Sequence, residues 1–403
     1  MPSPRPLLHY LVAPLACLLA GSAVATAPAA PLPLPLNQNG GVWNAGHVQG
    51  IAVDRRHGFI YYSFTTLLAK YDFKGHLIGT LTGWTGHLGD LDFNDSDGKV
   101  YGSLEYKKNQ GFYIAILDVD RIDHVGMVAG ESDIIRTVYL PEVFKDYAAD
   151  VNGDGVFDGD DGKYRDDVIA SPDHRYDCSG IDGVAFGPAF GHSDGKTYLT
   201  VAYGIYGNTR RGDNDHQVLL QYDIADWARY AAPLSESAPH RNGPERPAGK
   251  YFLRTGNTSY GVQNLSYDPQ MRRWFLGVYQ GSKPAFPNYL LFAVEARARP
   301  AMRPLVGVPA PDGKGWEQGM MLDLAADGLK DPATGIRGWR QEANVGFQPM
   351  GDGLFYIAAK AGAKGRQSAD LRLMRWTGDA EKPFVPVTSP MPGGDRPPVT
   401  QAQ

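Results

Sequence analysis

The sequence predicts an all-β fold, a seven-bladed β-propeller, from three observations. Short runs rich in β-branched and aromatic residues alternate with turn residues along most of the chain, as is typical of strands. The runs recur in groups of four within units of about 40 to 50 residues, the pattern of propeller blades. Helical periodicity is almost absent. Residues 41–385 hold seven or eight such units, and the long loops favour seven. The strands of a two-sheet sandwich, the alternative, would not recur in fours.

Two adjacent stretches show the repeat most clearly. The first unit contains four predicted strands, "HVQGIAVD", "FIYYSF", "LLAKYDF" and "HLIGTLTG", joined by the turns "RRHG", "TT" and "KG". The second unit repeats the cycle with "HLGDLDFN", the turn "DSDG", "KVYGSLEY" and "FYIAILDVD". Looser copies of the opening strand follow at 179–187 and 261–268, and "NVGFQPMGDGLFYIAAK" matches a last copy.

The two ends of the chain differ from this pattern. Residues 1–30 have a weakly basic start, the apolar stretch "LLHYLVAPLACLLAG" and small residues for cleavage, which predict a signal peptide. A retained membrane anchor is the alternative, but the apolar run is short and Pro14 interrupts it. We expect a proline-rich linker over 31–40, the propeller over 41–385 and a disordered tail over 386–403. The mature protein is then secreted or periplasmic.

Composition narrows the range of partners. The chain is 43% hydrophobic and 21% charged, with a net charge of −5. It can therefore bury a large core, and it is not suited to nucleic acid or to anionic membranes. Cys178 is the only cysteine outside the predicted signal peptide, which leaves no partner for an intramolecular disulfide. A small buried residue is favoured over a catalytic thiol there. We expect a monomer.

Two histidines occupy equivalent positions in the first two units. His47 lies seven residues ahead of Asp54, and His87 lies seven residues ahead of Asn94. Because the first strand of each blade lines the central channel, we expect both side chains at one mouth of that channel. The alternative is that each histidine only bonds the backbone of a neighbouring blade. Polar residues on the same strand of these and other copies are expected to join them: Gln49, Asp182, Gln263 and Asn264.

The sharpest local motif is "DVNGDGVFDGDD", residues 150–161. It matches the calcium loop D-x-N-x-D-G-x-x-D-x-x-D, in which Gly155 supplies a sharp turn. A hard divalent cation needs many oxygen ligands, so the motif predicts a calcium ion that stabilises a long insertion between blades. An acidic turn without a ligand is the alternative. The predicted ligands are Asp150, Asn152, Asp154, the Val156 carbonyl, Asp158 and Asp161.

Arginine and tyrosine gather around the third opening strand. In "DHRYDCSGIDG" (173–183), Arg175 could clamp a carboxylate through two parallel hydrogen bonds, or pair with Asp173 or Asp177 as a surface ion pair. The stretch "VAYGIYGNTRRGDNDHQ" (201–217) adds Tyr203 and Arg211, residue types that suit sugars, although turn chemistry explains its Gly, Asn and Asp. The sequence contains no zinc spacing, phosphate loop, dinucleotide fingerprint or serine nucleophile elbow.

Together, these motifs resemble a known family. The segments are "GHVQGIAVD", "YYSFTT", "TGHLGDLDFN", "DGKVYGSLEYK", "HRYDCSGIDGVAFGP", "VAYGIYG", "DNDHQVLLQYD" and "TGNTSYGVQNLSYDP", spread over residues 45–360. They resemble seven-bladed propellers that act on rhamnose-capped glucuronate. That family includes L-rhamnose-α-1,4-D-glucuronate lyases, which remove the terminal rhamnose of gum arabic and similar arabinogalactans, and related α-L-rhamnosidases that hydrolyse the same bond. Here "KKNQGFY" is shorter than in the family, and the calcium loop is an insertion.

The resemblance implies a secreted enzyme with histidine, tyrosine and arginine at a central cavity. By match to the family motifs, the implied catalytic residues are His87, His47, Arg175 and Tyr106. Carboxylate or sugar contacts are implied for Arg211 and Arg340, with Arg210 and Arg337 equally eligible. From their positions in the repeat and its loops, we add three substrate contacts, Tyr203, Gln263 and Asn264.

These residue types suit β-elimination. The C5 proton of glucuronate is lost and rhamnose leaves from O4, which requires a base, an acid and a group that neutralises the carboxylate. Histidine can take either of the first two roles, and arginine the third. A hydrolase favours paired carboxylates instead. A polysaccharide lyase is therefore the first expectation, an α-L-rhamnosidase the second, and a non-catalytic, calcium-stiffened carbohydrate-binding propeller the third.

Overall fold

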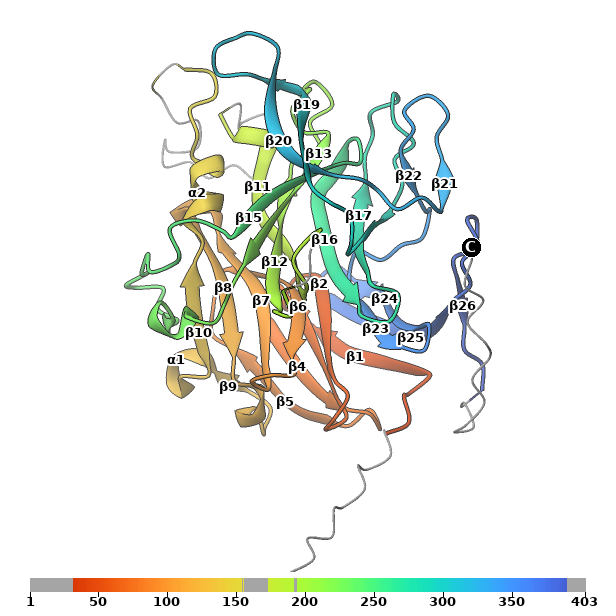
Figure 1. Ribbon diagram of the computed structural model, residues 1–403. Helices are drawn as coiled ribbons and strands as arrows, with labels where there is room; N and C mark the ends of the chain where they lie inside the picture. The colour runs from red at the N-terminus through yellow and green to blue at the C-terminus, as the bar shows by residue number, and fades with distance from the viewer. Residues whose placement is uncertain (1–31, 154, 156–172, 192–193, 390–403) are drawn as a thin grey trace, which may run out of the picture. The chain divides into compact units, whose positions relative to one another are not determined.

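The computed structural model describes residues 32–153, 155, 173–191 and 194–389, all within the compact unit Leu32–Gln403. These residues form an all-β propeller, which confirms the predicted fold class (Figure 1). The described residues form five blades, so the predicted number of seven is wrong.

Blades 1 and 2 follow the sequence expectation closely. Blade 1 contains β2 (Val48–Asp54), β3 (Phe59–Phe64), β4 (Leu67–Asp72) and β5 (Leu77–Thr82), with β9 (Met127–Val128) at its edge. Blade 2 contains β6 (His87–Asn94), β7 (Lys99–Tyr106), β8 (Gly111–Leu117) and β10 (Ile135–Tyr139), with β14 (Ala232–Pro233) outermost. The strands expected at "HLGDLDFN" and "KVYGSLEY" match β6 and β7 residue for residue, because the turn "DSDG" fixes where one ends and the next begins.

Blades 3 to 5 are larger or less regular. Blade 3 contains β11 (Cys178–Gly187), β12 (Tyr198–Ile205), β13 (His216–Tyr222), β15 (Gly249–Arg254), β20 (Trp316–Leu322) and β19 (Ala301–Pro309). Blade 4 contains β16 (Thr258–Asp268), β17 (Arg273–Gln280) and β18 (Leu291–Glu295), which a bridge at Trp339 links to the β21 (Leu329–Lys330) and β22 (Arg337–Gly338) pair. Blade 5 contains β23 (Phe347–Gly351), β24 (Leu354–Ala363), β25 (Arg366–Trp376), β26 (Phe384–Pro386) and β1 (Asn37–Trp43).

The first strand of the chain completes the last blade. β1 pairs antiparallel with β25, so residues 37–40 of the predicted linker belong to a strand. The described helices are short: α1 (Ala129–Ser132), α2 (Pro141–Tyr147) and 3-10 turns at Lys107–Asn109, Val119–Arg121, Arg175–Asp177 and Trp227–Arg229. In the part of the chain that the structure describes, none is long and apolar enough to cross a membrane.

The chain length that suggested seven blades is taken up by long connections between blades and by additional strands at the outside of a blade. β2 and β6 begin 39 residues apart, but the later inner strands begin 80 to 91 residues apart. α2 lies in the long connection after blade 2, and β19 and β20 extend blade 3 instead of forming a blade. The inner strands contact one another in the closed order β2, β6, β11, β16, β23. In the described residues one hydrophobic cluster lies between each pair of neighbouring blades, so five packed interfaces close the ring.

Buried carboxylates on β6 join the inner strands. Asp90 accepts hydrogen bonds from the Val184 amide on β11 (3.1 Å) and the Leu265 amide on β16 (2.8 Å). Asp92 accepts one from the Phe186 amide (2.7 Å). In the described part of the chain the inner strands belong to separate sheets, and these carboxyl side chains satisfy backbone donors of neighbouring blades.

Asp92 should make the stability of the fold depend on pH. Burial raises the pKa of its carboxyl to about 7, although the Phe186 and Phe93 amides bind the charged form. Because the folded-state pKa lies above the unfolded value, the stability from this group is complete below about pH 4 and is lost as pH rises to about 7. We expect urea unfolding to give a lower free energy at pH 7 than at pH 5, and Asp92→Asn to reduce the difference. An equal pH dependence in the variant would contradict the assignment.

Candidate functional site

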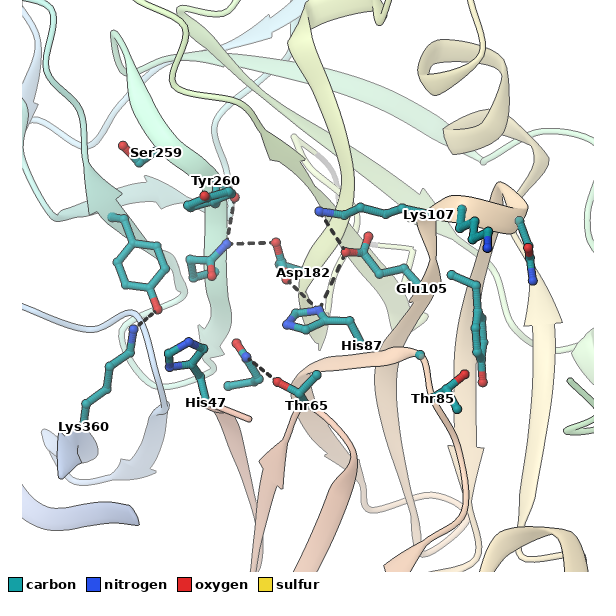
Figure 2. A pocket seen from close by; sticks show the side chains of 17 residues that line it. His47, Thr65, Thr85, His87, Glu105, Lys107, Asp182, Ser259, Tyr260 and Lys360 are labelled. Carbon is teal, nitrogen blue, oxygen red and sulfur yellow. Dashed lines mark hydrogen bonds and ion pairs between the residues drawn. The ribbon is translucent and has the colours of Figure 1, made fainter. Parts of the chain in front are cut away.

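A cavity of about 830 Å³ opens where several inner strands begin (Figure 2). His47 immediately precedes β2 and His87 begins β6, so neighbouring blades present both histidines to this cavity. All five blades contribute to its lining; Asp182 comes from blade 3, Tyr279 from blade 4 and Lys360 from blade 5. The structure thus brings together the two histidines that occupy matching positions in the sequence.

His87 lies between two carboxylates. Its Nδ1 is 3.7 Å from Glu105 Oε1 and 3.7 Å from Asp182 Oδ1. These separations are electrostatic contacts rather than hydrogen bonds. An ionised carboxylate carries negative charge and has no hydrogen to donate, so the two carboxylates favour the proton on Nδ1 and make Nε2 the basic atom of a neutral ring. The His87 side chain is 30% exposed, against 3% for Glu105 and 10% for Asp182. The histidine is therefore the member of this group that a ligand can reach.

Glu105 is held in place by its surroundings. The Ile181 amide donates to Glu105 Oε2 (3.0 Å), and Lys107 Nζ lies 3.4 Å from Oε1. Gly180 has φ of +122°, and a Cβ there would lie only 1.8 Å from Glu105 Oε2. Only glycine combines that backbone conformation with such a close approach. The carboxylate that faces His87 therefore depends on a glycine in the neighbouring blade.

Gln263 and Asn264 are neighbours on β16 but have different surroundings. Gln263 lines the cavity, and its Nε2 donates to Asp182 Oδ2 (2.8 Å) and to the Tyr260 carbonyl (2.7 Å). Asn264 is buried, and its amide donates to the Gln49 carbonyl (2.8 Å) and Asp90 Oδ1 (2.9 Å). A β-bulge interrupts the pairing of β16 with β17 between Val262 and Asn264, which changes the direction of the side chains there. The structure therefore places Asn264, predicted as a substrate contact, within the ring of inner strands.

Tyrosines and lysines supply the remaining chemistry. Burial, followed by the Glu236 carboxylate, raises the pKa of Tyr106, so its phenol keeps its proton at neutral pH. Burial also raises the pKa of Tyr279, whose hydroxyl accepts a hydrogen bond from Lys360 Nζ. Burial lowers the pKa of Lys360. Lysines, not arginines, bring positive charge to the lining: Lys107, Lys108 and Lys360.

Two of the predicted arginines lie away from the cavity lining. Arg175 Nη2 is 2.5 Å from Glu317 Oε2, which lies on β20 of blade 3, outside the cavity lining. Arg340 is largely exposed and faces Glu381 at 3.9 Å. The sequence left two roles open for Arg175: a clamp for a substrate carboxylate, or a surface ion pair with a neighbouring aspartate. Its partner is instead a glutamate 142 residues further along the chain.

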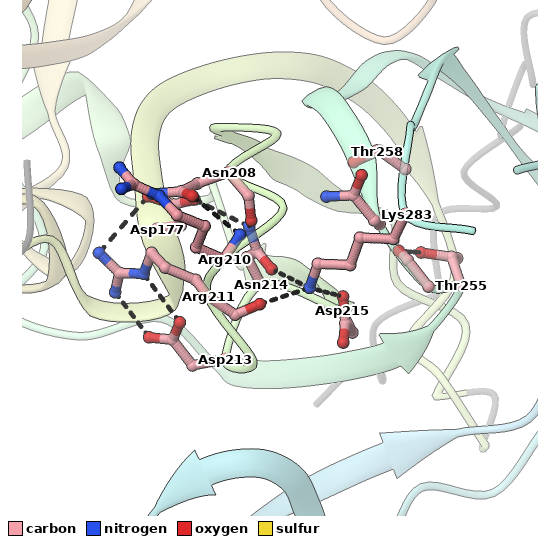
Figure 3. A network of polar contacts seen from close by, with 12 residues as sticks. Asp177, Asn208, Arg210, Arg211, Asp213, Asn214, Asp215, Thr255, Thr258 and Lys283 are labelled. Carbon is pink, nitrogen blue, oxygen red and sulfur yellow. Dashed lines mark hydrogen bonds and ion pairs between the residues drawn. The ribbon is translucent and has the colours of Figure 1, made fainter. Parts of the chain in front are cut away.

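Arg211 belongs to a polar network between blades 3 and 4 (Figure 3). Its guanidinium donates to both oxygens of Asp213 (2.8 and 2.6 Å) and lies 3.5 Å from Asp177. Lys283 donates to Asn214 Oδ1 (2.7 Å) in the same network. These charges satisfy one another away from the cavity, so Arg211, predicted as a substrate contact, stabilises a loop in this structure.

Two further residues singled out in the sequence are buried in blade 3. Tyr203 is fully buried, and its hydroxyl donates to Asp146 Oδ2 (2.7 Å) on α2. Cys178 begins β11, and burial raises the pKa of its thiol, which keeps the thiol protonated. Tyr203 therefore lies where a sugar has no access, and Cys178 has the burial expected of a small core residue.

The predicted calcium loop lies mostly outside the described residues. Asp150 accepts hydrogen bonds from the Gly153 amide (2.8 Å) and the Gly155 amide (3.0 Å), and the Asn152 amide donates to Asp173 (3.4 Å). The described ranges contain no group of three His, Cys, Asp or Glu residues that could hold a metal. Four of the six predicted ligands lie outside the described residues: Asp154, Val156, Asp158 and Asp161.

Sequence reasoning missed several cavity residues that a further comparison of units would have found. Glu105 lies at the end of β7, Tyr279 at the end of β17 and Lys360 in the last half of β24. Each of these is the second strand of its blade, which runs antiparallel to the inner strand and returns to the same rim. The opening strand of each unit was compared, whereas the end of the second strand was not.

Comparisons with known proteins add only distant likenesses. No family model matches the chain, and no curated protein matches it. The chain is similar to the Dos1 propeller (13% identity, TM-score 0.30, 85% of this chain and 71% of that one). It is also similar to the soluble aldose sugar dehydrogenase of Escherichia coli (11%, 0.34, 83% and 99%) and to a luciferin-regenerating enzyme (13%, 0.33, 87% and 97%). Likeness at this level says nothing about activity.

Proposed function

We propose that this protein is a secreted or periplasmic, monomeric polysaccharide lyase that removes terminal L-rhamnose from D-glucuronate in gum-arabic-type arabinogalactans. The observation that carries the proposal is His87, partly exposed between two buried carboxylates, in a cavity that also holds Tyr106 and three lysines. The choice of a rhamnosyl-glucuronate substrate rests on the resemblance of the sequence motifs. The lysines support an acidic substrate, because they are the cations that line the cavity.

The side chains can divide the elimination among them. His87 Nε2 takes the C5 proton of glucuronate, and Glu105 and Asp182 balance the charge that the imidazole gains. The cavity lysines neutralise the uronate carboxylate and the enolate-like intermediate. The Tyr106 phenol gives its proton to the glycosidic oxygen as the bond between that oxygen and C4 of glucuronate breaks, so the oxygen leaves with rhamnose. Return of the His87 proton to Tyr106 through water restores both residues, and the products are rhamnose and an unsaturated uronate.

Lysine replaces arginine in this scheme because of the observed contacts. The family resemblance implied Arg175, Arg211 and Arg340, but ion pairs with Glu317 and Asp213 occupy the first two. An ammonium is a compact point charge with three donors, whereas a guanidinium binds a carboxylate in a bidentate geometry. The lysine-lined cavity therefore suits charge neutralisation better than rigid orientation of the carboxylate.

Hydrolysis of the same bond is the second candidate, and one observation favours it. Glu105 and Asp182 each have an oxygen 3.7 Å from the same nitrogen of His87, so these oxygens lie at most about 7.4 Å apart, which allows the roughly 5–5.5 Å between the carboxyl groups of retaining glycosidases. Both side chains are nearly buried, however, and they bind the Ile181 amide and Gln263. With these contacts, the two carboxylates are better placed to orient His87 than to act as nucleophile or acid on a sugar. A propeller that only binds the polysaccharide is the third candidate.

The products distinguish these three functions. The purified protein is incubated with gum arabic while free rhamnose and the ultraviolet absorbance of an unsaturated uronate are followed together. We expect both to rise in parallel. Rhamnose without the absorbance would establish hydrolysis and shift attention to Glu105 and Asp182. Binding of the polysaccharide with no rhamnose released would establish the non-catalytic function.

We also propose that residues 150–161 bind a structural calcium ion. Removal of calcium with EDTA is then expected to lower the thermal midpoint, and added Ca²⁺ should restore it where Mg²⁺ does not, since Mg²⁺ demands a tighter octahedral site. Asp150→Ala should abolish the calcium-dependent shift, whatever its own effect on stability. Activity per folded molecule is expected to change little. A shift of equal size in the variant would disprove this site, and a loss of rate without a loss of stability would give the ion a catalytic role.

A further inference from the structure

A second, smaller cavity of about 140 Å³ adjoins the first. The two cavities share Thr85, Tyr106 and Asn109 in their walls. Pockets for drug-sized ligands measure about 300–1,000 Å³. The smaller cavity therefore has room for a group of about one sugar ring and no more.

A segment of blade 3 closes this smaller cavity against blade 2. The chain between β13 and β15 includes β14, which pairs with β10 at the edge of blade 2. Beyond β14, the Glu236 carboxylate accepts hydrogen bonds from the amide (2.6 Å) and hydroxyl (3.0 Å) of Thr85. The Tyr113 hydroxyl donates to the His240 carbonyl (2.8 Å). The wall is thus attached to blade 2 at several points, which keeps the cavity formed in the absence of a ligand.

A chain of hydrogen bonds through His240 determines which hydrogen-bonding groups the smaller cavity offers to a ligand. His240 Nδ1 accepts from the Asn242 amide (3.1 Å), so the neutral ring carries its proton on Nε2. Nε2 lies 2.8 Å from Thr137 Oγ1 and therefore donates to it. Burial lowers the pKa of His240, consistent with a neutral ring. Because the Thr137 oxygen is an acceptor in this contact, its own O–H can donate into the cavity that it lines.

The remaining lining suits a neutral sugar. The rings of Tyr106 and Tyr113 meet edge to face, with centroids 6.3 Å apart, and offer apolar surface to the C–H groups of a sugar. Glu236 accepts hydrogen bonds from hydroxyl groups, and its charge repels a second carboxylate. A donor, an acceptor and aromatic surface in a cavity of this size are the chemistry of one uncharged, hydroxyl-rich ring.

We infer that the smaller cavity is a subsite for a single neutral sugar, while the acidic residue of the same substrate lies against the lysines of the larger cavity. Identification of this sugar with the terminal rhamnose rests on the proposed function. Tyr106 forms part of the wall between the cavities, which places the proposed acid at the glycosidic bond. Since the cavity ends after one ring, the subsite accepts chain ends and excludes internal sugars.

Filling the subsite tests the inference through binding alone. Ser235, which is partly buried, lines the smaller cavity, whereas Ser237, which is exposed two residues further along the chain, does not. Ligand-observed NMR titrations with methyl α-L-rhamnoside and with D-glucuronate are compared for the whole protein, Ser235→Phe and Ser237→Phe. We expect Ser235→Phe to weaken rhamnoside binding by at least about tenfold and to leave glucuronate binding within about twofold, with both unchanged in Ser237→Phe. Thr137→Val, which removes the donor without filling the cavity, should also weaken only the rhamnoside.

Each outcome separates the subsite from the proposed reaction. Retained glucuronate binding shows that a variant is folded. Rhamnoside binding that Ser235→Phe and Thr137→Val leave unchanged, or its absence in the original protein, would overturn the subsite even if gum arabic is cleaved. Conversely, rhamnoside binding that depends on Ser235 would support the subsite even if no rhamnose is released from gum arabic, and only the enzymatic proposal would then fail.

Discussion

Replacement of His87 by alanine should lower kcat/KM on gum arabic by about 10²- to 10⁴-fold, the usual contribution of a positioned acid or base. Its partly exposed side chain belongs to none of the hydrophobic clusters of the described residues. We therefore expect the thermal midpoint to change little. The measurement pairs initial rates of rhamnose release with thermal unfolding of the same preparations, so that rates are expressed per folded molecule.

His124→Ala is the matched control for this variant. His124 is largely exposed and pairs only locally, with Asp123, in the connection between blade 2 strands β8 and β10. Its replacement should change neither rate nor midpoint. If His87→Ala instead lost stability and kept its rate per folded molecule, His87 would be a structural residue between blades. The proposed catalytic site would then have to be abandoned.

Asp90→Ala should have the largest effect on stability, a loss of about 2–6 kcal/mol of unfolding free energy from two orphaned backbone amides. The carboxylate accepts hydrogen bonds from the Val184 amide, the Leu265 amide and the Asn264 side chain, and it is buried. Each buried donor left without a partner costs about 1–3 kcal/mol. β11 of blade 3 and β16 of blade 4 lose their shared acceptor on β6 together, so the ring itself is weakened. Urea unfolding at constant pH measures the loss.

The control for this variant lies on the same blade. Asp95 is exposed in the turn after β6, and Asp95→Ala should change the unfolding free energy by no more than about 0.5 kcal/mol. A loss below about 1 kcal/mol for Asp90→Ala would mean that water or neighbouring side chains replace the acceptor. Hydrophobic packing between the blades would then hold the inner strands together, and the hydrogen bonds of Asp90 would contribute little.

The candidate site could be predicted only in part. The match between His47 and His87 was visible because each lies seven residues ahead of the last residue of an opening strand, Asp54 or Asn94, and the closed ring of inner strands then brings them to one cavity. The tyrosine at the end of β7, Tyr106, came from the resemblance. Glu105 and Lys360 were missed because only the opening strands were compared, and because a glutamate or lysine in a strand is ordinarily a solvated surface residue.

The sequence by itself determined the strand positions and the propeller class, because alternation with period two and turn residues act within about ten residues of chain. Tertiary structure alone decided the number of blades, which depends on how many hydrophobic interfaces close the ring. It also decided the ion pairs of Arg175 and Arg211 and the position of the smaller cavity. Glu317 is 142 residues from Arg175, and Glu236 is 151 residues from Thr85. No local pattern encodes such contacts, since they exist only once separate blades pack together.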